Sequence, residues 1–167
     1  MEPTELLEKF EELLEVTKLC YQCGTCAGGC PVFRQYPNFN PRRVMEKLLM
    51  KDFSEQLFDD QQIWYCSMCY TCSVRCPQGI DIGHVITEIK NLAVQMKNAP
   101  PGIIAEMEAI METGVTAAIS KGIMKRREQL ELPELPPPNL DEIRKIFEVT
   151  GAAKYIKEIK EIKEETS

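Results

Sequence analysis

The cysteines constrain this chain more than any other feature of its sequence. Eight cysteines occur in 167 residues, and they form two runs of four: Cys20, Cys23, Cys26 and Cys30, then Cys66, Cys69, Cys72 and Cys76. Both runs have the pattern Cys-x-x-Cys-x-x-Cys-x-x-x-Cys, and each is followed directly by a proline, Pro31 or Pro77. A spacing that repeats in full and uses every cysteine indicates a pair of related metal-binding loops.

The spacing is that of bacterial ferredoxins with two [4Fe–4S] clusters. Cysteines at positions i, i+3 and i+6 let one loop wrap three corners of a cluster, while backbone N–H groups turn toward the cluster sulfurs. The fourth cysteine follows too closely to close the same cube, so it ligates the other cluster. The pattern therefore predicts one cluster on Cys20, Cys23, Cys26 and Cys76, and a second on Cys66, Cys69, Cys72 and Cys30.

Two other uses of the cysteines fit less well. Structural zinc would account for two Cys-x-x-Cys pairs but not for three equally spaced cysteines and an outlying Cys-Pro, repeated. A disulfide framework needs an oxidising compartment. The chain begins with Glu2, Glu5 and Glu8 instead of the basic and apolar segments of a secretory signal, so we expect a cytoplasmic protein in a reducing environment.

Charge and hydropathy exclude two further classes. With 20 basic and 26 acidic side chains, the formal net charge is −6, which argues against binding to nucleic acid through the phosphate backbone. No apolar run approaches the length of a membrane span, about 20 residues.

The segments around the cysteines have helical patterns, and none alternates with the period of a strand. The sequence predicts helices over residues 6–17, from a cap at Asn40, over 53–58, and from a cap at Asp81 to Met96. We expect an all-α fold with a two-cluster domain at 1–99, a helical extension at 100–131, a proline-rich linker at 132–138 and C-terminal helices at 139–167 that dock a partner. Within the extension and the C-terminal region, helices are expected over 103–113, from a cap at Asn139 to Gly151, and over 154–165. The last of these is expected either as a solvated amphipathic helix or as a docking arm.

Several of these motifs closely resemble the C subunit of heterodisulfide reductase. The resemblance covers about residues 15–100 and lies in Cys20–Cys26, Gly28–Pro31, Asn40–Arg42, Trp64–Cys72 and Cys76–Pro77. It implies an α-helical ferredoxin fold, shared with the iron–sulfur subunits of succinate dehydrogenase and anaerobic glycerol-3-phosphate dehydrogenase. Only 19 residues precede Cys20, too few for the [2Fe–2S] domain of the succinate dehydrogenase type. The 91 residues after Cys76 contain no cysteine, unlike the fused types with further cysteine-rich repeats.

The resemblance implies an electron relay in an oxidoreductase complex. In the family, a flavin-bearing A subunit bifurcates electron pairs, and one branch passes through the C subunit to the B subunit, which reduces the coenzyme M–coenzyme B heterodisulfide in methanogenesis. Hydrogenase or formate dehydrogenase components would supply electrons indirectly. The alternatives are a freestanding ferredoxin-type carrier and an iron–sulfur subunit of another flavin-dependent dehydrogenase. We expect no catalytic residue in this chain, because the single histidine, His84, is expected at the surface or at a helix cap and every thiol is expected to be a ligand.

The surroundings of the two runs differ in side-chain size and charge. The first run is rich in small residues, Gly24 and Ala27–Gly29, whereas the second carries Met68, Tyr70, Val74 and Arg75. We therefore expect clusters of unequal potential. Trp64 is expected to pack beside Cys66. The basic residues near the runs are expected to raise the potentials, to meet an acidic partner, or to be solvated; they are Arg34, Arg42, Arg43 and Arg75.

Overall fold

The protein divides into two compact units, Met1–Asn98 and Ala99–Ser167. The computed structural model describes residues 3–51, 61–117 and 119–165. Every regular element in these ranges is a helix, which confirms the predicted all-α class. None of the helices in the described part of the chain has the length and apolarity of a membrane-spanning segment.

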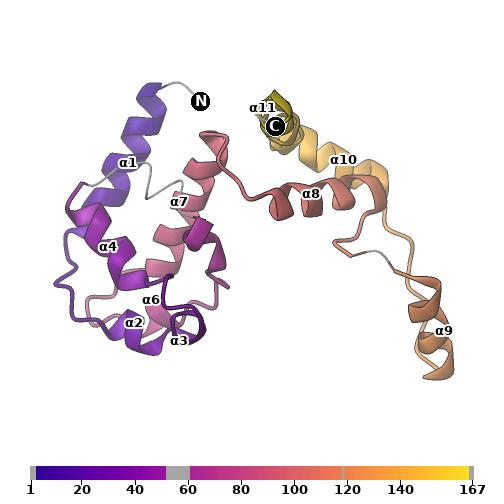
Figure 1. Cartoon of the computed structure of the whole chain (residues 1–167), viewed down its shortest axis with the longest axis horizontal. Helices are drawn as coiled ribbons and strands as arrows, with labels where there is room; N and C mark the ends of the chain where they lie inside the picture. The colour runs from indigo at the N-terminus through magenta and orange to yellow at the C-terminus, as the bar shows by residue number, and fades with distance from the viewer. Residues whose placement is uncertain (1–2, 52–60, 118, 166–167) are drawn as a thin grey trace. The chain divides into compact units, whose positions relative to one another are not determined.

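The first unit is a bundle of three longer helices with short helices at one end (Figure 1). Helices α1 (Pro3–Thr17), α4 (Pro41–Leu49) and α7 (Ile82–Gln95) contact one another. The short helices α2 (Thr25–Gly29) and α6 (Thr71–Val74), which belong to the two cysteine runs, also contact each other. Helix α3 (Pro31–Gln35) and the 3-10 helix η1 (Gln61–Tyr65) complete the unit. The topology thus brings both runs to the same end of the bundle.

The predicted caps position the helices that follow the runs. Asn40 Oδ1 accepts hydrogen bonds from the amides of Arg42, at 3.0 Å, and Arg43, at 3.4 Å. Asp81 Oδ1 accepts from the His84 amide at 3.0 Å, and the His84 side chain is exposed, as predicted. Such caps satisfy amides that have no partner within the helix.

Helix α7 stops just before the predicted Met96. Lys97 adopts a left-handed conformation, with φ of 63°. The Asn98 amide donates to the Ala93 carbonyl at 2.8 Å, which is the bond that closes a Schellman motif. Met96 therefore lies outside the helix, and 47% of its surface is exposed.

The apolar faces predicted for the three long helices meet in the core of the first unit. Its fully or almost fully buried side chains include Leu13, Met45, Leu48, Val85, Ile86, Ile89 and Leu92. Burying an aliphatic side chain of this size contributes about 1.5–3 kcal/mol. The predicted helix over residues 53–58 lies outside the described residues.

The second unit has its own core. Helices α8 (Pro101–Thr113), α10 (Leu140–Val149) and α11 (Ala152–Glu165) contact one another. Helix α8 begins two residues before the predicted Ile103, because Pro101 occupies its first position, where a missing N–H costs nothing. Residues 132–138, the proline-rich segment, have no regular secondary structure.

The C-terminal helices bury only part of their predicted apolar faces. Asn139 caps α10 through the Glu142 amide, at 3.3 Å, as predicted. Ile156 and Ile159 of α11 are buried within the second unit. In contrast, 59% of the Ile146 surface on α10 is exposed. Ile156 and Ile159 are therefore used for packing inside the unit, whereas 44% of the Ile162 surface on the same helix is exposed.

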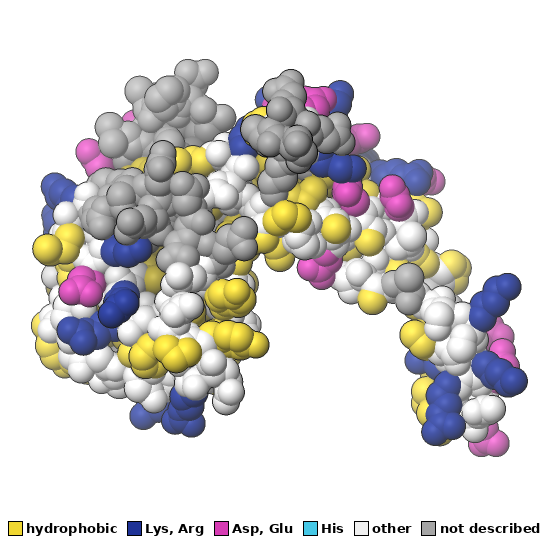
Figure 2. Space-filling model, in the orientation of Figure 1, with side chains coloured by type: hydrophobic (Ala, Val, Ile, Leu, Met, Phe, Trp, Pro, Cys, Tyr) yellow, Lys and Arg dark blue, Asp and Glu magenta, His cyan; other side chains and the backbone are white. Residues whose placement is uncertain are grey.

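Residues 121–127 contain two lysines and two arginines and belong to a separate helix, α9 (Lys121–Gln129), which was not among the helices expected from the sequence. Ser120 caps it by accepting from the Ile123 amide at 3.3 Å. Figure 2 shows Lys and Arg side chains along this helix, and every residue from Lys121 to Arg126 is exposed.

Candidate metal centre

The two cysteine runs have the same backbone conformation. Two residues after the first cysteine of each run, Gln22 and Met68 have φ of 62° and 53°. Four residues after it, Gly24 and Tyr70 have φ of 83° and 56°. Alternation of ordinary and left-handed residues turns successive amide N–H groups toward one side and makes a concave site for negative charge. The sequence repeat is therefore also a repeat of anion-binding loops.

Positive φ is costly for side chains larger than glycine. Only Gly24 among these four positions lacks a Cβ, whereas Gln22, Met68 and Tyr70 adopt the left-handed conformation against their intrinsic preference. Strain of this kind persists where the surrounding structure fixes the backbone, and it is concentrated at ligand-binding sites.

The second cysteine of each run is exposed and has a threonine beside it. Cys23 Sγ lies 3.3 Å from Thr25 Oγ1, and the Cys69 thiol donates to Thr71 Oγ1 at 3.4 Å. Once the thiol ionises, the threonine hydroxyl becomes the donor. Hydrogen bonds from the side chain and then the backbone of Thr25 and Thr71 lower the pKa of Cys23 and Cys69, respectively. Both thiolates are thus stabilised by the loop that carries them.

Three further cysteines lie deeper, where burial opposes their ionisation. Burial raises the pKa of Cys26 to about 11, and burial also raises the pKa of Cys66 and Cys72. Such thiols ionise readily only when a cation is present, because metal coordination supplies the compensating charge.

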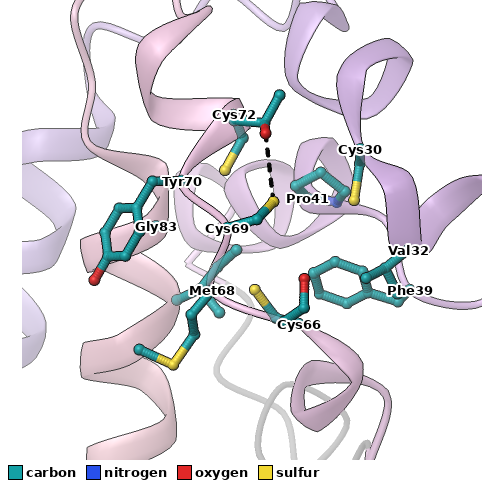
Figure 3. A pocket seen from close by; sticks show the side chains of 13 residues that line it. Cys30, Val32, Phe39, Pro41, Cys66, Met68, Cys69, Tyr70, Cys72 and Gly83 are labelled. Atoms are coloured by element: carbon teal, nitrogen blue, oxygen red, sulfur yellow. Dashed lines mark hydrogen bonds between the residues drawn. The ribbon is translucent and has the colours of Figure 1, made fainter.

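One hollow brings together the four cysteines predicted to bind the second cluster. Cys30, Cys66, Cys69 and Cys72 line it together with the side chains of Val32, Phe39, Pro41, Met68, Tyr70 and Ile86. Figure 3 shows the four sulfur atoms gathered around this space. Cys30 belongs to the first run and the other three cysteines to the second, so the hollow joins segments separated by more than 30 residues.

The cysteines predicted to bind the first cluster are also neighbours. The pKa of Tyr21 is raised first by its hydrogen bond with Cys23, and the ionised thiols of Cys23 and Cys76 raise it further. Burial is the main cause of the raised pKa of Cys26, and the charges of Cys72 and then of Cys20 contribute to it. Cys76 of the second run therefore lies beside the first.

These donors fit [4Fe–4S] clusters in number, type and surroundings. Each loop offers soft thiol ligands and turned amides, and the second also has an apolar wall, features that hold such clusters and set their potentials. Among the described residues, no three histidine, cysteine or acidic side chains lie close enough to share a single metal ion. A four-iron cluster instead takes one thiolate at each of four irons.

Lys90 is a buried cation beside the hollow that sequence analysis did not identify. Only 9% of its surface is exposed. Its Nζ donates to the Cys66 carbonyl at 3.0 Å and lies 5.6 Å from the centre of the Trp64 ring. Burial lowers the pKa of Lys90, whereas the negative charge of Cys66 raises it. Trp64 packs against the core in this position, beside Cys66 as predicted.

Of the predicted basic residues, two contact the loops. Arg42 Nε donates to Gln22 Oε1 at 3.2 Å. A Cβ on Gly29 would lie 2.9 Å from Arg75 Nη1, so the absence of a side chain at Gly29 allows the guanidinium to approach. Arg34 and Arg43 are exposed, like Arg42 and Arg75.

The chain matches a family model described as a 4Fe-4S dicluster domain over residues 16–80. This segment contains both runs, and the match agrees with the two [4Fe–4S] clusters predicted from the spacing.

Similarity to known proteins extends beyond the cluster domain. The iron–sulfur C2 subunit of the CoB–CoM heterodisulfide reductase of Methanocaldococcus jannaschii is 32% identical over 143 residues, which cover 82% of this chain and 75% of the relative. The iron–sulfur C subunit of the Methanopyrus kandleri enzyme is 33% identical over 93% of this chain and 84% of the relative. The C subunit of the ferredoxin:CoB–CoM heterodisulfide reductase of Methanosarcina mazei is 34% identical over 82% of this chain and 91% of the relative.

Proposed function

Because this chain belongs to the family of the iron–sulfur C subunits of CoB–CoM heterodisulfide reductases, we propose that it relays electrons from a flavin-bearing A subunit to a B subunit that reduces the heterodisulfide. The chain itself contributes two [4Fe–4S] clusters and no substrate-converting site. It acts in the cytoplasm as a component of an oxidoreductase complex in methanogenesis, in which the A subunit bifurcates electron pairs supplied by hydrogenase or formate dehydrogenase components.

The observation that carries this proposal is the hollow in which Cys30 meets Cys66, Cys69 and Cys72. Ligands exchanged between the runs hold two clusters in one small unit, and short separation is what an electron relay requires. Bound [4Fe–4S] clusters supply one-electron redox chemistry. The residues of this chain hold them, exclude water from their buried corners and present one exposed cysteine, Cys23 or Cys69, at each.

The ligand assignment is tested by comparing serine variants of the cluster-loaded protein. Cys30→Ser is expected to change the electron paramagnetic resonance signal of the same cluster as Cys69→Ser. Cys76→Ser is expected to change that of the same cluster as Cys23→Ser. If Cys30→Ser and Cys23→Ser instead alter one common signal, each run binds its own cluster and the exchange of ligands is wrong.

We further propose that the C-terminal helices dock one of the other subunits. Ile146 and Val149 of α10 are 59% and 80% exposed, and they are three residues apart, so they lie on one face of the helix and can contribute to a common apolar contact surface. A freestanding carrier needs only the cluster domain and not the second unit. Size-exclusion chromatography of the native protein separates the two functions: co-elution with a flavoprotein is expected, whereas a stable monomer of 19.1 kDa would favour the freestanding ferredoxin.

The relay itself is tested by stopped-flow mixing of the reduced, cluster-loaded chain with its purified B subunit. Oxidation of the clusters is expected on mixing with both the B subunit and heterodisulfide, and not with heterodisulfide alone. Oxidation by heterodisulfide in the absence of the B subunit would place a substrate site in this chain and contradict the proposal.

A further inference from the structure

Lys90 lies on α7 four residues after Ile86, and so on the same face of the helix as this lining residue of the hollow. The helix places the lysine against the start of the second cysteine run, where its ammonium donates to the Cys66 carbonyl at 3.0 Å. The ammonium also lies 5.6 Å from the centre of the Trp64 ring. The charge is thus held at a fixed position by one hydrogen bond and one cation–π contact.

A lysine is rarely buried to this extent unless an opposite charge compensates it. Among the described residues, the group whose negative charge would act on Lys90 is Cys66, once its thiol ionises. A carbonyl oxygen and an aromatic ring offset part of the cost of burial but carry no net charge. The missing negative charge is provided when Cys66, Cys69, Cys72 and Cys30 bind a cluster, because four thiolates outweigh the charge of an oxidised [4Fe–4S] core.

Reduction adds one more negative charge to the cluster. A nearby buried cation interacts more strongly with the reduced cluster than with the oxidised one, and so favours reduction. Burial matters here, because charges in the protein interior are screened far less than exposed charges.

The first run has no equivalent buried lysine in the described part of the chain. Arg42 contacts its loop by binding Gln22, and Arg75 approaches the same run at Gly29, but both side chains are exposed. Water and salt screen an exposed guanidinium, so its effect on the first cluster is expected to be small.

We propose that Lys90 is the counter-charge of the second cluster, and that it raises the potential of this cluster relative to the first. The inference rests on the proposed function in one respect, the ligation of the second cluster by Cys66. Lys90 acts through Cys66 and is a positioning residue, not a ligand. It gives the pair a direction, because electrons move toward the cluster of higher potential.

The test is a redox titration of the full-length, cluster-loaded protein, followed by electron paramagnetic resonance. The variants are Lys90→Met, Lys90→Arg and, as a matched control, Arg42→Gln. The second cluster is identified by the signal that Cys69→Ser changes or abolishes. Lys90→Met removes the charge while keeping an apolar chain of similar length.

We expect Lys90→Met to lower the reduced-to-oxidised ratio of the second cluster about tenfold or more at a given solution potential, which corresponds to a midpoint lower by about 59 mV or more. The first cluster should be unaffected. Lys90→Arg should retain most of the wild-type potential, and Arg42→Gln should shift neither cluster appreciably. A merely structural lysine would instead alter cluster content or thermal stability and leave the midpoint unchanged.

Two other outcomes are distinguishable. If Lys90→Met leaves both midpoints at their wild-type values while both clusters are present, the counter-charge role is wrong and the proposed relay is unaffected. If the wild-type protein binds no second cluster, the proposed function fails first. Should Lys90→Met not accumulate as a loaded protein, Lys90→Gln and the ordering of Lys90→Arg against wild type provide the same comparison.

Discussion

Replacing Gly83 by alanine tests whether the loop of the second run is locked against α7. Gly83 is the second residue of α7 and is buried. A Cβ added to it would lie 2.7 Å from Cδ1 of the Tyr70 ring and 3.1 Å from Ser73 Oγ. Ser73 Oγ is held in place because it accepts from the Gly83 amide at 2.8 Å, and the Tyr70 ring can relieve the contact only by turning toward solvent, to which 43% of the residue is already exposed.

Two effects of opposite sign determine how Gly83→Ala changes the stability of the first unit. Alanine is favoured over glycine inside a helix by about 1 kcal/mol. Overpacking a well-filled site costs about 1–3 kcal/mol. The distance of 2.7 Å is well inside van der Waals contact, which places the cost toward the upper end. We therefore expect Gly83→Ala to destabilise the first unit by up to about 2 kcal/mol.

The strain should appear first at the second cluster. Tyr70 lies between the predicted ligands Cys69 and Cys72 and lines the hollow that they share. Displacing its ring moves the loop that holds both thiolates. We expect Gly83→Ala to lose the signal of the second cluster, or to release its iron faster, before the first cluster is affected.

The matched control is Gly102→Ala. Gly102 is the second residue of α8, as Gly83 is of α7, but no heavy atom lies within 4 Å of its added Cβ. Thermal unfolding is followed by circular dichroism and cluster loss by visible absorbance. Gly102→Ala should melt at or above the wild-type temperature, and Gly83→Ala below it. If Gly83→Ala melts like the control and keeps both clusters, the contact with Tyr70 does not lock the loop of the second run against α7.

Three further perturbations follow from the same structure. Thr71→Val removes the hydroxyl beside Cys69 and should lower the midpoint potential of the second cluster alone, by up to about 59 mV in a redox titration; a shift of the first cluster would contradict this. The Ser73 hydroxyl and then the His84 amide hold the pKa of Asp81 below its usual value, so the stability that its charge provides is present above that usual value and is lost as the pH falls through the lowered pKa. Asp81→Asn should therefore keep the helix cap but melt with less dependence on acid pH, whereas equal acid sensitivity in variant and wild type would exclude the role of this carboxylate. Removing iron should unfold the first unit but leave α8, α10 and α11 helical, because their core is independent of the cysteines; unchanged hydrogen-exchange protection of α7 after chelation would refute it.

Much of the helical framework could be predicted, because local signals and packing agree. Asn40 and Asp81 each precede an apolar stripe of helical period, and both cap a helix in the structure. The apolar residues of α7 recur on one face, and that face is buried. The sequence spacing was likewise sufficient to predict which cysteines meet in the hollow, although their role as ligands stays a prediction.

Several features depend on tertiary contacts and therefore cannot be predicted from the periodicity of apolar residues in the sequence. A lysine in an amphipathic helix is ordinarily assigned to the solvated side, and only the approach of Cys66 and Trp64 explains the burial of Lys90. Glycine at position 24 indicates a left-handed residue, but nothing local indicates one at Met68 or Tyr70. Helix α9 was missed because its sequence is basic and largely without an apolar face, so its Ser120 cap was the available signal.

The two loops are alike in backbone conformation but differ in their surroundings, and this explains how their clusters can differ in potential. Matching left-handed conformations at Gln22 and Gly24, and at Met68 and Tyr70, give each cluster the same turned amides, so the loops alone would give the clusters similar potentials. The two loops differ in the charges that contact them: two exposed arginines, Arg42 and Arg75, contact the first, and a buried lysine contacts the second. Since buried charge acts at short range with little screening, one lysine on α7 is sufficient to make the pair unequal. A relay built from a sequence repeat thereby acquires a direction without altering the part of the structure that binds iron.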